Sequence, residues 1–150
     1  MKSISRKLPV VARIVLGLIF VVFGLNGLLH FLPQPPAPPA AAGAFAGALM
    51  ATGYFFPLLK ITEIVAGSLL LLGVVVPLAL TLLAPIIVNI VAFHLFLAPG
   101  NWGIVGLLLA AELFLAWTYR AAFAPLFARR PLADSVHQPV TLEPARRQAA

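Results

Sequence analysis

The feature that most constrains this chain is an apolar stretch from Phe55 to Leu97 that contains only two charged residues. As one helix, its roughly 43 residues would extend about 65 Å, about twice the hydrocarbon thickness of a bilayer. The stretch must therefore fold back. Gly73 and Pro77 predict the turn, since glycine favours a helix end and proline a helix start. We expect two antiparallel membrane-spanning helices, over residues of about 56–75 and 78–97.

Two further apolar runs predict spans over residues of about 9–32 and 103–120. A signal peptide is the competing interpretation of the first run. Its apolar region of about 25 residues, however, exceeds the roughly 7–15 residues of a signal-peptide core. The Pro-rich segment 33–39 cannot continue the helix, so the first span should end at or before Leu32. The Ala-rich segment 40–52 predicts a short helix that lies on the outer surface or re-enters the membrane slightly.

Composition supports an all-α fold, an integral membrane four-helix bundle with a short extra helix in its first outer loop. Apolar residues make up 62% of the chain and charged residues 9%, whereas about a quarter of a soluble domain is charged. No cysteine is present, which excludes disulfides, thiolate metal sites and thiol redox relays. The spans use nearly all residues up to Tyr119, so any chemistry must take place in or at the lipid bilayer.

The basic residues predict the orientation. Nine of the ten Lys and Arg residues lie in the N-terminal segment up to Arg13 or from Arg120 onward, and the loops 33–54 and 98–102 contain none. The positive-inside rule then places both termini in the cytoplasm. This flanking pattern also argues against a nucleic-acid partner. We expect a four-helix domain over residues 1–127 and a disordered, basic cytoplasmic tail over residues 128–150.

Each predicted span also contains polar residues, which are costly in lipid unless they have a partner, a cavity or a nearby interface. Counted from the outer end of each span at about 1.5 Å per residue, most of them lie in the outer half of the membrane, and the one in the fourth span lies near the middle. We therefore predict a shared outward-facing pocket. Its candidate residues are His30, Lys60, Glu63, Asn89, His94 and Glu112.

Structural explanations for these residues stay open. Lys60 could extend its amine to the headgroups, or form an intrahelical pair with Glu63. The histidines could be interfacial or core residues. Asn26 lies four residues before His30 and should share its helix face, and the asparagines could join helices by hydrogen bonds. Glu112 has the strongest functional case, because a carboxyl group in mid-membrane must be protonated, paired or hydrated.

Three ligand classes fit these residues to different degrees. A haem would need His30 and His94 on facing helices. A metal bound by these histidines and Glu63 lacks any local spacing motif, so no metal site is expected. A quinone or lipid headgroup needs only apolar walls, aromatic side chains such as Phe56 and Phe93, with Phe55 beside them, and a few hydrogen-bonding groups. The quinone pocket fits best, although the identity of any cofactor stays open.

Small residues and prolines predict how the helices pack. Gly17, Gly24 and Gly27 lie near one face of the first span, where missing side chains allow a neighbouring helix to approach closely. Pro85 should bend the third span, because it removes a backbone hydrogen bond.

Three stretches carry a resemblance to a known family: Arg13 to Gly27 (RIVLGLIFVVFGLNG), Thr52 to Gly67 (TGYFFPLLKITEIVAG) and Pro85 to His94 (PIIVNIVAFH). Together they resemble the DoxX family of small bacterial membrane proteins, over roughly residues 8–127. The resemblance implies four transmembrane helices in the bacterial inner membrane. It also implies a loose link to redox chemistry, since founding members are associated with a thiosulfate:quinone oxidoreductase.

Two functional hypotheses follow. In the first, the chain is a quinone-linked membrane subunit, in which Lys60 or His94 bonds a quinone carbonyl and Glu63 or Glu112 exchanges protons. In the second, it is a non-enzymatic scaffold or chaperone for a partner membrane protein, and the polar cluster only stabilises the bundle. A partner redox protein and a homo-oligomer are both compatible with the first. A transporter ranks third, because four short spans without an internal repeat offer little material for alternating access.

Overall fold

The computed structural model describes residues 2–33 and 37–127, and all the regular secondary structure among them is helical. The elements are α1 (Lys2–Leu29), α2 (Ala40–Ala51), α3 (Phe55–Leu72), α4 (Val76–Phe96), α5 (Trp102–Thr118), α6 (Arg120–Phe123) and the 3₁₀ helix η1 (Ala124–Phe127). The expected all-α class is confirmed for these residues. The tail predicted over residues 128–150 lies outside them.

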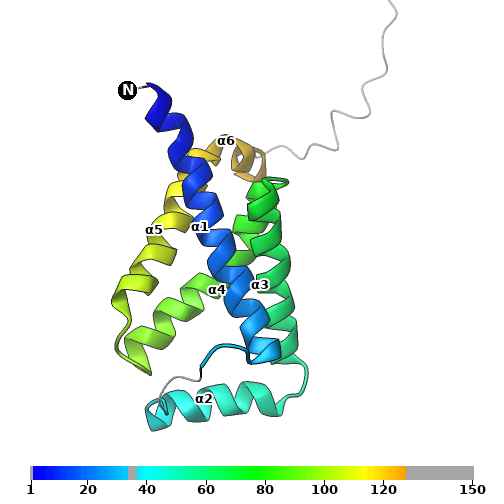
Figure 1. The fold of residues 1–150 in the computed structure, drawn as a ribbon, viewed down its shortest axis with the longest axis vertical. Helices are drawn as coiled ribbons and strands as arrows, with labels where there is room; N and C mark the ends of the chain where they lie inside the picture. Colours follow the sequence, from blue (N-terminus) through cyan, green and yellow to red (C-terminus); the bar gives the residue numbers. More distant parts are fainter. Residues whose placement is uncertain (1, 34–36, 128–150) are drawn as a thin grey trace, which may run out of the picture.

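Four helices run along the long axis of the molecule, and α2 lies across one end of them (Figure 1). Going around the bundle, α1 packs against α3, α3 against α4, α4 against α5, and α5 against α1. The start of α1 and the short helix α6 lie at the end opposite α2 (Figure 1). By length and composition, Lys7–Leu29 of α1, α3 and α4 can each cross a membrane, whereas the apolar helix α5 is shorter, with 17 residues in all.

The turn between α3 and α4 lies where glycine and proline predicted it. Gly73 adopts the left-handed conformation, with φ of 73°, and its N–H donates to the carbonyl oxygens of Leu69 and Leu70 at 2.9 and 3.2 Å. Pro77 occupies the first turn of α4, where its missing N–H costs nothing. The connection is therefore a tight helical hairpin. Val75 in this turn has a φ of 41°, which is strained for a β-branched residue.

The first helix ends at Leu29, three residues earlier than the predicted limit at Leu32. His30 leaves the helical conformation with φ of 53°. The side chain of Asn26 then turns back over the helix end, and its Oδ1 accepts a hydrogen bond from the N–H of Leu32 at 2.7 Å. Asn26 therefore caps the end of its own helix, and within the described ranges its side chain makes no hydrogen bond to another helix, which was one expectation for it.

Helices α1 and α3 approach closely through glycines, as the glycine face of α1 predicted. A Cβ atom added to Gly17 would lie 2.8 Å from the carbonyl oxygen of Gly67, and one added to Gly67 would lie 2.9 Å from that of Gly17. Gly24 and Gly27 face Ile64 and Lys60 of α3 in the same way. The two backbones therefore touch with no room for even a methyl group.

The hydrophobic core occupies the half of the bundle away from α2. It is built from Leu16, Phe20, Ala66, Leu70, Val76, Ala79, Leu80, Leu83, Ile87, Leu108, Ala111 and Leu115. The outer faces of the helices carry large exposed apolar side chains, such as Val88 at 64% and Leu113 at 61%. Apolar helix faces of this kind are compatible with contact to lipid. The backbone N–H and C=O groups behind them are paired within the helices, as a lipid environment requires.

A candidate ligand cavity with a polar cluster

A cavity of about 560 Å³ occupies the other half of the bundle, beside α2. This volume lies within the range of about 300–1,000 Å³ that small-molecule sites have. All five helices from α1 to α5 contribute to its lining. The apolar part of the wall includes Phe20, Phe23, Phe45, Phe56, Phe93 and Leu108, and the polar part consists of Lys60, Glu63, Asn89, His94 and Asn101.

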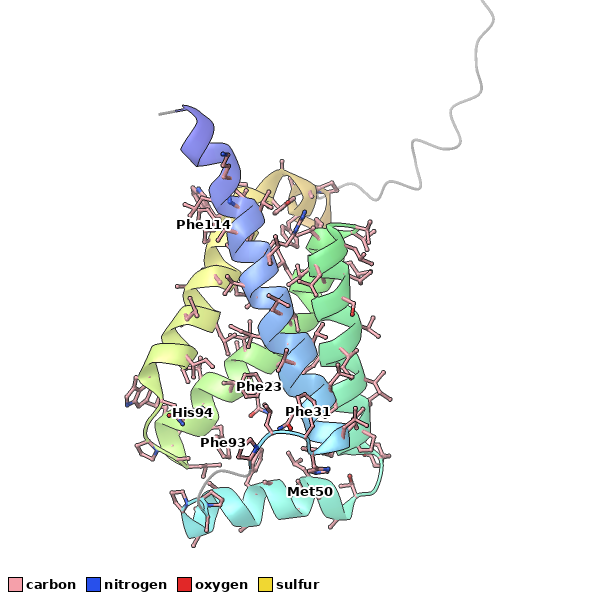
Figure 2. All side chains as sticks on the ribbon, in the orientation of Figure 1. Phe23, Phe31, Met50, Phe93, His94 and Phe114 are labelled. Atoms are coloured by element: carbon pink, nitrogen blue, oxygen red, sulfur yellow. The ribbon has the colours of Figure 1, made fainter. Side chains whose placement is uncertain are left out.

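The helix α2 covers the end of this cavity. Phe45, Ala46 and Leu49 share one helical face, and all three line the cavity. The ring of Phe45 lies 6.0 Å from that of Phe93 on α4. Figure 2 shows α2 crossing below the ends of α1 and α4, with Phe93 and His94 pointing toward the space between them. The short helix expected from the Ala-rich segment thus serves as the end wall of the cavity.

The cavity also has a side that is accessible from outside the bundle. Phe23 of α1 and Ile104 of α5 both line it, and they are 47% and 39% exposed. In Figure 2, the labelled Phe23 lies beside α1 on the side that faces α4. An apolar molecule that approaches between α1 and α5 therefore meets these two side chains first.

The charged pair at the cavity comes from one helix. Lys60 Nζ donates to both carboxylate oxygens of Glu63, at 3.0 Å to Oε1 and 2.8 Å to Oε2. The Lys60 side chain is 16% exposed and that of Glu63 5%. The Lys60 stem lies against Gly27, where any side chain would displace it, and its amine lies 5.5 Å from the ring centre of Phe56.

This arrangement decides between two interpretations of Lys60. Its amine is directed along α3 to Glu63, one turn further from α2, and so does not reach toward the end of the helix that carries Tyr54. The ion pair was one of the two expectations, and it is present; extension of the amine to the headgroups is not seen. Because the pair has no net charge, the cavity favours a neutral ligand over a charged one.

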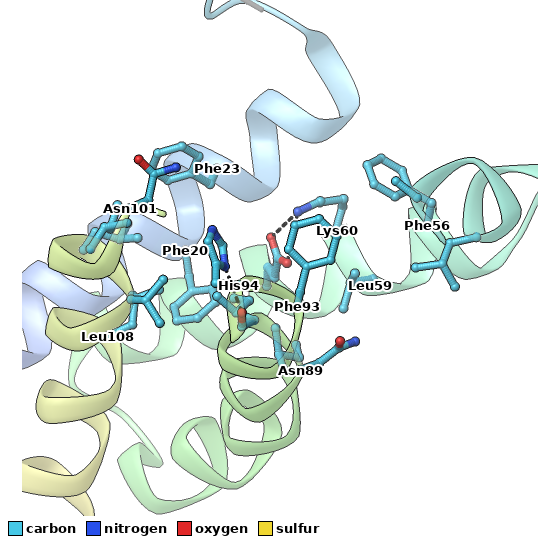
Figure 3. Close-up of a pocket in the computed structure, with 18 of the residues that line it drawn as sticks. Phe20, Phe23, Phe56, Leu59, Lys60, Asn89, Phe93, His94, Asn101 and Leu108 are labelled. Atoms are coloured by element: carbon cyan, nitrogen blue, oxygen red, sulfur yellow. Dashed lines mark hydrogen bonds and ion pairs between the residues drawn. The ribbon is translucent and has the colours of Figure 1, made fainter. Parts of the chain in front are cut away.

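His94 brings an unusual donor and acceptor pattern to the cavity. Its Nδ1 lies 2.9 Å from the carbonyl oxygen of Ile90, one turn earlier on α4. A carbonyl oxygen only accepts, so Nδ1 carries the hydrogen in this contact. The ring of Phe93 meets that of His94 edge-on, with centres 5.5 Å apart. These two contacts hold the imidazole and leave Nε2 directed away from α4 (Figure 3).

Two asparagines complete the polar lining. Asn89 is one helical turn before Phe93 on α4, and Asn101 is the residue just before α5; both are exposed and line the cavity. Asn101 has a φ of 53°, a conformation that asparagine tolerates better than most residues. Amide groups both donate and accept, so neither side chain restricts the ligand to one kind of hydrogen bond.

Two of the six predicted pocket residues do not line the cavity. His30 was placed on the same helix face as Asn26, but the helix ends at Leu29 and the exposed His30 lies in the turn that follows. Glu112 was expected in the same pocket, yet it lies one turn beyond Leu108, in the packed half of the bundle. The cavity therefore brings together only Lys60, Glu63, Asn89 and His94 of the predicted set.

Glu112 is a buried carboxyl group in a packed apolar environment. It is 6% exposed, and its Oε2 has no hydrogen-bond partner among the residues that the structure describes. The same residues contain no group of three or more His, Asp or Glu side chains placed to hold a metal ion. The alternative of a metal bound by His30, His94 and Glu63 is therefore not supported by the geometry.

Several lining residues were not singled out from the sequence. Phe20 and Phe23 of α1, Phe45 of α2 and Asn101 all line the cavity, whereas Phe55, named with the wall residues, does not. In a helix that is apolar on all sides, the sequence does not indicate whether a phenylalanine faces the bundle interior or the outside. For Asn101, the turn sequence before Trp102 gave a usable signal, because it places a polar side chain at the same end of the bundle as His94.

The chain was also compared with known proteins. No protein-family model, no curated protein and no solved structure matches it.

Proposed function

We propose that the chain is a multi-pass membrane protein that binds the ring of a quinone in this cavity, as the quinone-linked membrane subunit of an oxidoreductase system. The observation that carries the proposal is the cavity itself: about 560 Å³ with mostly apolar walls, and an ion pair and a histidine within it. Lipid-soluble ligands with a small polar ring need this combination.

The proposal includes four spans. Three helices meet the length and composition for crossing a membrane. At 1.5 Å per residue, the 17 residues of α5 extend about 26 Å, close to the hydrocarbon thickness of about 30 Å. The distribution of Lys and Arg favours cytoplasmic termini, with α2 on the outer side. The resemblance of three stretches to the DoxX family favours the bacterial inner membrane.

Within the proposal, Lys60 is the donor to a quinone carbonyl. An ammonium group has three hydrogens, and Glu63 takes two of them. The third has no acceptor among the residues that the structure describes, and in the proposal it bonds a ligand oxygen. Glu63 is the only carboxylate among the lining residues, so any proton exchange with the ligand falls to it. Glu112 does not line the cavity, so in this proposal it does not exchange protons with the ligand directly.

The test is native mass spectrometry of the protein, extracted gently from its own membrane, with an absorption spectrum of the same sample. Ala46 lines the cavity and Ala48 on the same helix does not. We expect about one quinone per chain in the wild type and in Ala48→Phe. Ala46→Phe should lose it, because the larger side chain fills the cavity. Bulk phospholipid alone in the wild-type sample would refute the proposal.

The scaffold role remains a second candidate, favoured by one observation on α5. Cβ atoms added to Gly103 or Gly106 would meet no described atom within 4 Å, so this face of α5 can accept a helix from another chain. In that case, the same mass spectrometry would show a second polypeptide, or a second copy of this chain, in fixed ratio and without a small molecule.

A further inference from the structure

We infer that the cavity selects ligands that carry a hydroxyl group, and that His94 is the residue that makes the selection by accepting the hydrogen bond of that hydroxyl. The inference rests on the proposed function, because it concerns the same cavity. For a quinone-type ligand it means that the reduced, hydroxylated ring binds more tightly than the oxidised one.

The contact between His94 and Ile90 fixes the hydrogen position on the His94 ring. The Ile90 carbonyl oxygen lies 2.9 Å from Nδ1 and can only accept, so the hydrogen of the neutral ring is on Nδ1. Nε2 then has a lone pair and no hydrogen. A ligand carbonyl placed against Nε2 would bring two acceptors together, whereas a ligand hydroxyl would complete a hydrogen bond.

The ring cannot easily turn to offer a donor. A flip of the imidazole would break the bond to Ile90 and leave the freed Nδ1 hydrogen to find a new partner within an apolar wall. The edge-on contact with Phe93, at 5.5 Å between ring centres, further restricts the ring. Figure 3 shows the bonded nitrogen on the side of α4 and the other one directed into the space between Phe23 and Lys60.

The charged residues of the lining offer more hydrogen-bond acceptors than donors to a ligand. Glu63 can only accept, and two of the three hydrogens of Lys60 are already bonded to it. Besides the amides of Asn89 and Asn101, which both donate and accept, the lining therefore offers acceptors on His94 Nε2 and Glu63 against one remaining hydrogen on Lys60. A ring with hydroxyl groups satisfies more of these groups than a ring with only carbonyl or ether oxygens.

The experiment uses a prenylated phenol and its methyl ether, which share a carbon skeleton but differ in the hydroxyl hydrogen. Binding of both is measured to the full chain in lipid nanodiscs. We expect the phenol to bind about 2- to 12-fold more tightly, the range of one net hydrogen bond. This ratio should approach one in His94→Leu. It should also fall in His94→Gln, whose amide can donate to the ether. The control variant His30→Asn changes a histidine outside the cavity and should keep the wild-type ratio.

Equal binding of both probes to the wild type, or tighter binding of the ether, would overturn the inference and leave the proposed site standing. Binding of neither probe would overturn both. Nitrogen-15 NMR of the wild type in bilayers gives a reading without any ligand: we expect the hydrogen of His94 on Nδ1, and a hydrogen on Nε2 alone would refute this hydrogen position.

Discussion

The close contact of α1 and α3 predicts that a single methyl group added at Gly67 lowers the stability of the bundle. The new Cβ of Gly67→Ala would lie 2.9 Å from the carbonyl oxygen of Gly17, and 3.0 Å from the N and Cγ2 of Val21. Two of these atoms are backbone, so the helices must move apart. Overpacking of this kind lowers the free energy of unfolding by about 1–3 kcal/mol. The higher helix propensity of alanine raises it by up to about 1 kcal/mol. We therefore expect a net loss of up to about 2 kcal/mol.

Gly106→Ala is the matched control. A Cβ atom there meets no described atom within 4 Å, so only the propensity term applies, and we expect stability to rise by up to about 1 kcal/mol. The assay is equilibrium unfolding in mixed micelles with increasing sodium dodecyl sulfate, followed by circular dichroism. If Gly67→Ala were as stable as Gly106→Ala, the backbones of α1 and α3 would not be in contact, and the reasoning would fail.

Three further substitutions test the polar residues by the same unfolding assay. Glu63→Gln should lower the free energy of unfolding by about 1–3 kcal/mol, because it leaves the partly buried Lys60 without its carboxylate. Adding Lys60→Met should restore most of the lost stability. Simple additivity of the two single losses would contradict the ion pair. Glu112→Gln should leave stability unchanged or raise it, since Oε2 has no described partner to lose; a loss above about 1 kcal/mol would indicate a partner after all. Asn26→Leu should cost about 1 kcal/mol by removing the acceptor of the N–H at the end of α1, and an unchanged midpoint would argue against this cap.

The sequence was most informative about where helices lie. The length of the apolar runs predicted helices, and Gly73 with Pro77 predicted the hairpin, because these residues act through local backbone conformation. The glycines of α1 also predicted a close neighbour correctly, since a missing side chain has a direct steric consequence. Each of these features depends on a few consecutive residues, so each can be recognised without knowledge of the three-dimensional fold.

The site was predicted only in part, because membership in a cavity depends on direction as well as depth. Depth along a span correctly grouped Lys60 with His94 at one end of the bundle. It could not show that α1 stops before His30, nor that packing closes the bundle before Glu112 is reached. The first follows from a local side-chain cap by Asn26, which the apolar pattern of the span does not reveal. The second is a consequence of tertiary structure, because Leu108 and its neighbours fill the interior.

The position of α2 has a consequence for how any ligand is measured. Phe45, Ala46 and Leu49 of α2 lie across the end of the cavity. On its side between α1 and α5, the cavity is lined by the exposed side chains of Phe23 and Ile104. A ligand that enters there comes from the bilayer, so its relevant concentration is its mole fraction among lipids. Apparent dissociation constants expressed per volume of water should then rise in proportion to the amount of lipid added, while the mole-fraction constant stays fixed.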